Sequence, residues 1–125
     1  RMSAFFKLLK KEWKNIVFNL FFAIINALVV VIFFENNYLT LISLIILSLI
    51  YFITYRSSLI LAVFLCGFFA AFLEMFAISY NVWSYAFPNF GNVPIWLFVL
   101  WGNTCMFFYR TAIEFERLGI HDPSR

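Results

Sequence analysis

The sequence predicts an all-α integral membrane protein with four transmembrane helices and an N-terminal amphipathic helix at the membrane interface. Hydrophobic residues make up 65% of its 125 positions and charged residues 12%. A soluble domain of this length has to cover its surface with polar groups, which this composition cannot supply. The apolar runs approach the ~20 residues that a helix needs to cross ~30 Å of hydrocarbon. They lack the alternation of a transmembrane barrel, so helices are expected.

Four apolar runs predict the spans 15–34, 38–55, 58–78 and 93–110. The first run is longer than the apolar core of a signal peptide and precedes no small-x-small cleavage site, so we expect it to be retained. Residues 111–125 are expected to form a cytoplasmic tail. No linker or internal repeat divides the chain, and residues 1–125 are treated as a single membrane domain.

Residues 3–14 are predicted to form a separate short helix that lies at the membrane surface. Phe5, Leu8, Leu9 and Trp13 recur at helical spacing, and four lysines occupy much of the remainder. Such a pattern is typical of an interfacial anchor. Docking onto an acidic protein partner is the alternative.

The basic residues predict the orientation of the chain in the membrane. They gather before the first span, between the second and third, and after the fourth, whereas residues 35–37 and 79–92 contain no Lys or Arg. The positive-inside rule then places both termini in the cytoplasm of a multi-pass protein of the plasma membrane. The net charge of +3 is a consequence of this topology, and no nucleic-acid partner is expected.

Glu74 is the acidic residue that lies well inside a predicted span. An intramembrane carboxyl is costly, which favours a functional role. The alternative is a structural carboxyl that accepts hydrogen bonds from Trp and Tyr donors at the outer interface. Gly67, Ala71 and Glu74 share one helix face, and small residues allow close helix packing, so this face is expected to point into the bundle or at a partner.

Asn26 and Asn103 are predicted to meet near the middle of the membrane. Counting ~1.5 Å per residue from opposite sides places both at a similar depth. A contact between them would satisfy both amides and hold the first helix against the fourth. Cys66 and Cys105 have no other ligands at suitable spacing, so neither a metal nor a cofactor is expected.

The segment between the third and fourth spans is the most distinctive part of the chain. It is rich in aromatic residues, as expected at a membrane interface. Pro94 is predicted in the first turn of the fourth helix, with Asn92 as a possible cap. The residues expected to contact lipids or a partner are Trp83, Tyr85, Pro94, Trp96 and Trp101.

About 30 residues of this region resemble a motif of carotenoid-modifying membrane proteins, the carotenoid hydratase and lycopene cyclase families. The matching residues are Glu74, Trp83, Tyr85, Gly91, Val93, Pro94 and Trp101. The resemblance implies a membrane helix bundle that acts on isoprenoids. The cyclases, however, carry paired glutamates after the proline, where this chain has Ile95, Trp96 and Leu97. The acid pair that protonates a polyene is therefore missing.

Three functions remain open from the sequence. The leading hypothesis is an accessory or structural subunit of a larger integral-membrane complex, whose partners are membrane lipids and other membrane subunits. The first alternative is an enzyme that modifies isoprenoids, carotenoids or other lipids, although no complete catalytic constellation is visible. The second alternative is a small proton-coupled transporter that uses Glu74.

Overall fold

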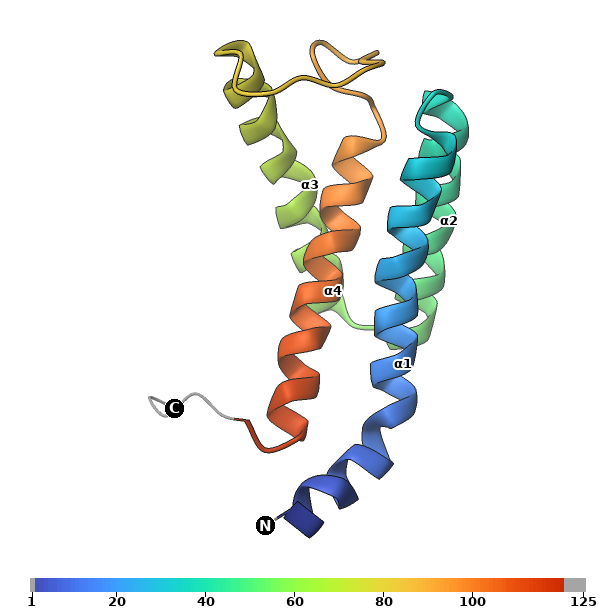
Figure 1. Ribbon diagram of the computed structural model, residues 1–125, viewed down its shortest axis with the longest axis vertical. Coiled ribbons are helices and arrows are strands. Elements are labelled where there is room, and N and C mark those ends of the chain that lie inside the picture. Colours follow the sequence, from blue (N-terminus) through green and yellow to red (C-terminus); the bar gives the residue numbers. More distant parts are fainter. Residues whose placement is uncertain (1, 121–125) are drawn as a thin grey trace.

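The computed structural model describes residues 2–120 of the chain. It contains four helices, which are α1 (Met2–Phe33), α2 (Asn37–Tyr55), α3 (Ser58–Ser79) and α4 (Leu97–Arg117). Consecutive helices run in opposite directions (Figure 1). The α1–α2 turn and the segment between α3 and α4 lie at one end, called the loop end. The start of α1 and the end of α4 lie at the other, called the basic end. Residues 80–96, between α3 and α4, are called the aromatic loop.

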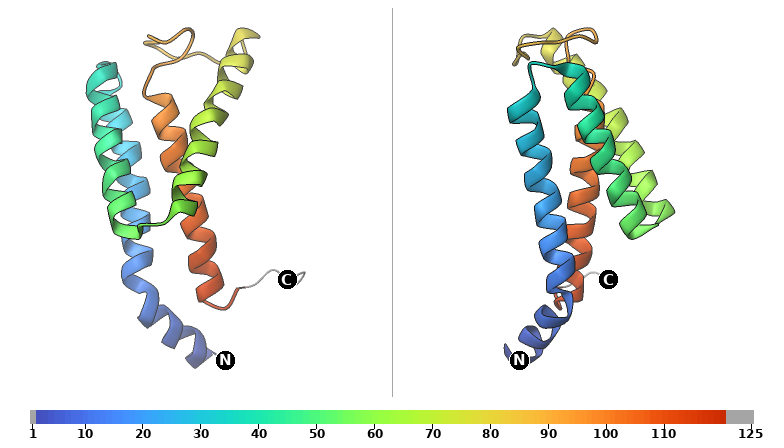
Figure 2. Two further views of the ribbon diagram at one scale, coloured as in Figure 1. Left: turned by 180° about the vertical axis from the view of Figure 1, so that it is seen from behind. Right: turned by 90° about the vertical axis from the view of Figure 1, so that its right-hand side faces the viewer.

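Helix α4 is the central helix of the bundle, because it packs against each of the other three. The two views of Figure 2 show α1 and α2 side by side, α4 beside them and α3 against the far side of α4. Helices α2 and α3 diverge toward the loop end. The central position of α4 explains why its polar residues Asn103, Arg110 and Glu114 are buried.

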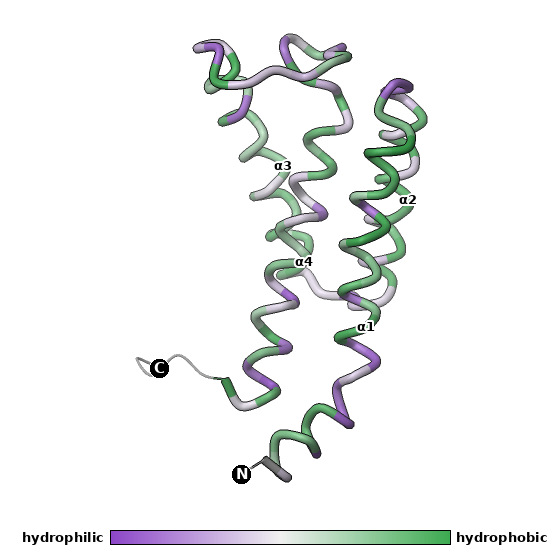
Figure 3. Tube along the Cα trace, viewed as in Figure 1, coloured by the Kyte–Doolittle hydropathy of each residue, from purple (hydrophilic) through white to green (hydrophobic). Residues whose placement is uncertain are grey.

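Three of the helices are long and apolar enough to cross a membrane: residues Ser3–Phe33 within α1, and the whole of α2 and α3. Their surfaces expose large apolar side chains such as Val31, Ile53 and Leu73. Figure 3 shows hydrophobic residues along most of the helices and hydrophilic ones near the basic end and at the turns. This arrangement is compatible with a multi-pass membrane protein, because water would not solvate such a surface.

The predicted break between an N-terminal helix and the first span is wrong. Helix α1 continues from Met2 to Phe33, and its first turns bend away from the rest without a break (Figure 1). No Gly, Pro or helix-ending motif occurs within it, so nothing stops the hydrogen-bond ladder.

The predicted bounds of the fourth helix are also wrong at both ends. Helix α4 begins at Leu97, not at residue 93, and continues to Arg117. Residues 111–117, which were assigned to a tail, belong to this helix. Their polar side chains bond to α1 and to other residues of α4. Residues 121–125 of the predicted tail lie outside the described residues.

Side-chain caps define the starts of α2 and α3. The Asn36 side chain accepts a hydrogen bond from the Leu39 N–H at 3.1 Å, and Ser57 Oγ accepts one from Ile60 N–H at 3.4 Å. Arg56 adopts the left-handed region at φ 43° and ends α2. These two tight turns account for the short connections between the first three helices.

Candidate functional site

The Glu74 carboxylate, near the loop end of α3, accepts hydrogen bonds from three aromatic side chains. Oε1 accepts from Trp83 Nε1 at 3.1 Å and from the Tyr85 hydroxyl at 2.6 Å, and Oε2 accepts from Trp101 Nε1. The donors come from the aromatic loop and from α4, so one carboxylate joins three segments. A charged carboxylate accepts but cannot donate, and an indole N–H donates but cannot accept, so the partners are complementary. This geometry agrees with the alternative in which Glu74 is a structural carboxyl that accepts hydrogen bonds from Trp and Tyr donors.

Gly67 and Ala71 bring α3 against α4 and direct Glu74 into the bundle, which is one of the two orientations predicted. Ala71 is fully buried, with 0% of its surface exposed. A Cβ atom on Gly67 would lie 2.5 Å from the backbone oxygen of Trp101. Since no side chain fits there, glycine is required for the close approach that lets Trp101 reach Glu74.

Two asparagine side chains fasten the aromatic loop to the bundle. Asn37, at the start of α2, donates to the Phe87 carbonyl at 2.9 Å and accepts from Trp96 Nε1 at 3.1 Å. Asn92 Nδ2 donates to the Met75 carbonyl of α3 at 3.0 Å. The loop is therefore tied to α2 and α3 in addition to its bonds with Glu74.

The loop turns sharply just before α4. Phe90 and Val93 pair their backbones across this turn, and Gly91 occupies it at φ +63°, a conformation that favours glycine. The predicted cap at Asn92 is wrong, since its side chain bonds to α3. Asn89 Oδ1 instead accepts from the Ile95 N–H at 2.7 Å. Pro94 precedes the first residue of α4, and its carbonyl accepts from the Leu97 N–H at 3.1 Å.

The loop has a buried half and an exposed half. Val93 and Trp96 expose 0% and 4% of their surface and sit in the apolar core, with Tyr85 and Trp101 packed beside them. The other half presents large apolar side chains to the surroundings, and we call these the exposed rim: Tyr80, Val82, Trp83, Phe87 and Phe90. Because the loop is anchored, these exposed side chains are held in a fixed arrangement for contact with lipids or another protein.

Tyr85 is held in its neutral, hydrogen-donating form. Burial raises the pKa of its hydroxyl, and the hydrogen bond to Glu74 and the charge of that carboxylate raise it further. The phenol therefore remains a donor to Glu74 across the physiological pH range.

The contact between Asn26 and Asn103 that the sequence predicts is confirmed. Asn103 Nδ2 donates to Asn26 Oδ1 at 2.8 Å and to the Leu44 carbonyl at 3.2 Å. Asn103 Oδ1 accepts from the Ser48 hydroxyl at 2.5 Å. Asn103 is fully buried, so these bonds join α1, α2 and α4 in the middle of the bundle.

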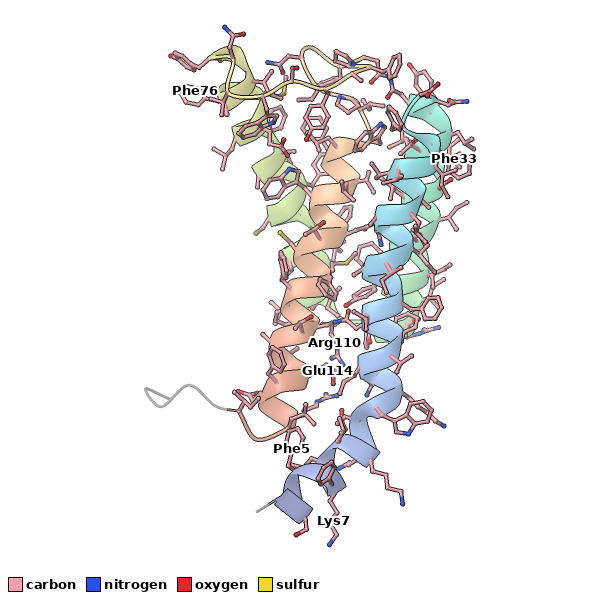
Figure 4. All side chains as sticks on the ribbon, in the orientation of Figure 1. Phe5, Lys7, Phe33, Phe76, Arg110 and Glu114 are labelled. Atoms are coloured by element: carbon pink, nitrogen blue, oxygen red, sulfur yellow. The ribbon has the colours of Figure 1, made fainter. Side chains whose placement is uncertain are left out.

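Sequence reasoning missed a buried carboxylate, Glu114, in the basic half of α4. Its Oε1 accepts from Arg110 Nη2 at 2.6 Å, and the two side chains are 5% and 8% exposed. Both reach into the space between α4 and α1 (Figure 4). The Arg110 guanidinium also lies 4.1 Å from the centre of the Tyr55 ring. The i,i+4 spacing of Arg110 and Glu114 is the sequence signal that could have revealed this pair.

A polar layer separates this ion pair from the central amides. The Tyr51 hydroxyl donates to Asn19 Oδ1 at 2.8 Å, and Asn19 Nδ2 donates to the Thr111 hydroxyl at 3.0 Å. Tyr51 is fully buried, with 0% exposed. Polar bonds between helices thus recur from the middle of the bundle to its basic end.

Glu12 fastens the bent start of α1 to the end of α4. It accepts from Arg117 Nη1 at 3.2 Å and from Asn15 Nδ2 at 3.3 Å. Burial alone would raise the pKa of Glu12, but these two hydrogen bonds and the charge of Arg117 leave it below its ordinary value. The stability that this contact contributes is therefore present near neutral pH and is lost only as pH falls through the lowered pKa.

Comparison with known proteins adds no assignment. The chain matches no protein-family model, no curated protein and no solved structure. The resemblance to carotenoid-modifying proteins therefore stays a prediction from the sequence.

Proposed function

We propose that the chain crosses the plasma membrane four times, with both termini in the cytoplasm. The basic residues at one end of the bundle and their absence from the aromatic loop support this orientation. Helix α4 is the fourth span in this proposal. Its charged residues Arg110 and Glu114 are buried against neighbouring helices and paired with each other, which is how ionisable groups are accommodated in membrane proteins. The bent start of α1 then lies along the cytoplasmic interface.

In this membrane the protein acts as an accessory subunit of a larger integral-membrane complex. The observation that carries this proposal is the anchored aromatic loop, whose exposed rim lies at the outer end of the bundle. Four hydrogen bonds to Glu74 and Asn37 hold the loop in place. Large aromatic side chains on a rigid support are typical of residues that dominate binding between proteins.

The hydrogen bonding of Glu74 also favours a subunit over the two alternatives. An isoprenoid-modifying enzyme or a proton-coupled transporter needs a carboxyl that can exchange its proton with a substrate or with water. Both oxygens of Glu74 are already bonded to Trp83, Tyr85 and Trp101. A carboxylate used in this way holds segments together.

Photocrosslinking in the native membrane tests the proposal. Benzoylphenylalanine is placed at Val82 on the exposed rim and, as the matched control, at Ile32, a similarly exposed apolar residue near the same end of α1. We expect irradiation to produce one discrete adduct of fixed mass at Val82 and diffuse lipid adducts at Ile32. Native mass spectrometry of the tagged, detergent-extracted protein should then give that partner at fixed stoichiometry. Recovery as an isolated monomer, with lipid adducts at both positions, would contradict a subunit role.

A further inference from the structure

Three adjoining cavities lie along α4, the first against α3 and the other two against α1. The first, about 270 Å³, lies beside Glu74 and Trp101. The second, about 410 Å³, is lined by α1 residues such as Ala23 and Ala27 and by α4. The third, about 180 Å³, lies toward the basic end and includes Glu114 in its lining. The first two share Leu100, Thr104 and Phe108, and the last two share Phe107, so they form one groove.

The groove ends on a buried polar atom without a partner. Glu114 Oε2 has no hydrogen-bond partner among residues 2–120, although the side chain is 5% exposed and Oε1 is bonded to Arg110. A buried carboxylate oxygen without a partner is costly. Glu114 belongs to the lining of the third cavity, so a hydrogen-bond donor bound there would lie beside this carboxylate.

The charge around Glu114 selects the kind of donor. Arg110 already neutralises the carboxylate, so an ammonium group would add an uncompensated positive charge beside the guanidinium. A phosphate would place a second anion against Glu114. A neutral hydroxyl can donate to Oε2 without changing the charge of the pair.

The length of the groove indicates how long the hydrocarbon chain of the bound alcohol is. Helix α4 rises ~1.5 Å per residue, so Leu100 and Glu114 are separated by ~21 Å along its axis. One leaflet of the hydrocarbon core is ~15 Å thick. The groove, which Ala27, Phe107 and Phe108 help to line, is therefore longer than one leaflet and extends beyond the midplane. An acyl chain that spans a single leaflet would leave part of the groove empty.

We propose that this groove binds a long-chain alcohol, whose hydroxyl donates to Glu114 and whose chain runs along α1 and α4 toward Glu74. This site goes beyond the subunit role and depends on the membrane location but not on a protein partner. The rim can therefore fail to bind a partner while the groove binds its lipid, and the reverse is also possible.

The test uses a long-chain primary alcohol with a diazirine at mid-chain, added to the protein in phosphatidylcholine nanodiscs. We expect photolabelling on the peptides that contain Ala27 and Phe108. The methyl ether of the same probe should bind about tenfold more weakly, a loss of ~1.4 kcal/mol, because it cannot donate to Glu114. Labelling of equal strength by alcohol and ether would overturn the proposal, as would equal labelling by a diazirine phosphatidylcholine.

Two variants locate the site. Ala27→Phe fills the groove from an exposed position and should reduce labelling to background. Its matched control, Ala62→Phe, changes an exposed alanine of α3 that lines none of the three cavities and should leave labelling unchanged. The double variant Arg110→Met/Glu114→Leu leaves no unpaired charge and should lower alcohol labelling to the level of the ether. Labelling that is indifferent to Ala27→Phe would place the probe elsewhere and refute the site.

Discussion

At the scale of single residues, buried polar side chains hold this bundle together, because lipid supplies little hydrophobic drive for helix association. Glu74 connects α3 to the aromatic loop and α4, while Asn103 connects α4 to α1 and α2. Each contact is made by a residue that would be costly in hydrocarbon without its partners. The stability of the fold should therefore be sensitive to these few positions.

Glu74→Leu should lower the free energy of unfolding by about 2 kcal/mol, because it leaves the half-buried donors of Tyr85 and Trp101 unpaired. Trp83 contributes less, since it is 45% exposed and can find another partner. Glu74→Gln retains one acceptor oxygen and should cost about 1 kcal/mol. Thermal unfolding in detergent, followed by tryptophan fluorescence, measures both losses. A Leu variant as stable as the Gln variant would show that these hydrogen bonds do not support the fold.

Asn26 and Asn103 should show a coupling energy of ~0.6 to ~1.7 kcal/mol in a double-mutant cycle of leucine substitutions, the range found for interhelical hydrogen bonds in membranes. The cycle isolates their contact, because the effect of losing the Ser48 bond cancels. Reversible unfolding in SDS–detergent mixtures supplies the four free energies. As a control, Asn26 and Thr54, which is exposed and bonded to its own helix at Ile50, should behave additively. Additivity of the Asn26–Asn103 pair as well would contradict the role of this contact.

At the scale of elements, α4 organises the molecule through two different faces. One face carries Gly102 and lies opposite Gly67 of α3. The lack of side chains at these two positions lets α3 approach closely. The other carries the polar residues that meet α1 and α2. The position of α4 in the centre follows from this combination, because each of its faces finds a matching neighbour.

Gly67→Leu should separate α3 from α4, because even a Cβ atom there would lie 2.5 Å from the Trp101 carbonyl oxygen. Overpacking of this kind typically costs about 1–3 kcal/mol, and more where backbone must move. The matched control is Ala62→Leu on the exposed side of α3, which should be neutral. Comparing the melting temperatures of the two variants in the same detergent decides the matter; equal melting temperatures would argue against close α3–α4 packing.

Arg110→Met should destabilise the bundle by about 3–5 kcal/mol, because Glu114 is left as a buried, unpaired charge. Adding Glu114→Leu should recover most of this loss, since an apolar pair of similar volume avoids the desolvation penalty. Equilibrium unfolding of the single and double variants provides the comparison. If the double variant is no more stable than the single one, the ion pair is not the reason for the first loss.

The sequence predicts the elements better than their bounds. Hydropathy locates all four helices, and helical spacing correctly places Gly67, Ala71 and Glu74 on one face of α3, which in the structure packs against α4. The extension of α4 to Arg117 was missed because its charges, when counted along the sequence, suggest a solvated tail. Only the fold reveals that Arg110 and Glu114 face α1 and α2. The hydrogen bond from the Ile95 N–H to Asn89 was missed for a similar reason, since it depends on the path of the loop.

At the scale of the whole molecule, the two ends of the bundle differ in chemistry. The loop end carries aromatic residues anchored around Glu74, and the basic end carries the lysines of α1 and the ion pairs of α4. Between these two ends, polar contacts join the helices at several levels along the bundle. In the proposed orientation, the outer rim contacts a partner, the groove between α1 and α4 holds a lipid, and the basic end faces the cytoplasm.

Cysteine labelling of the intact membrane tests this arrangement most directly, because it asks whether α4 crosses. Single cysteines at Glu35, Val82, Ser58 and Gly119, in a chain whose Cys66 and Cys105 are replaced by alanine, are exposed to a membrane-impermeant maleimide before and after permeabilisation. The account predicts labelling of Glu35 and Val82 in intact cells and of Ser58 and Gly119 only after permeabilisation. Labelling of Gly119 from the same side as Val82 would show that α4 does not cross the membrane, and would contradict the four-span arrangement on which the proposed function depends.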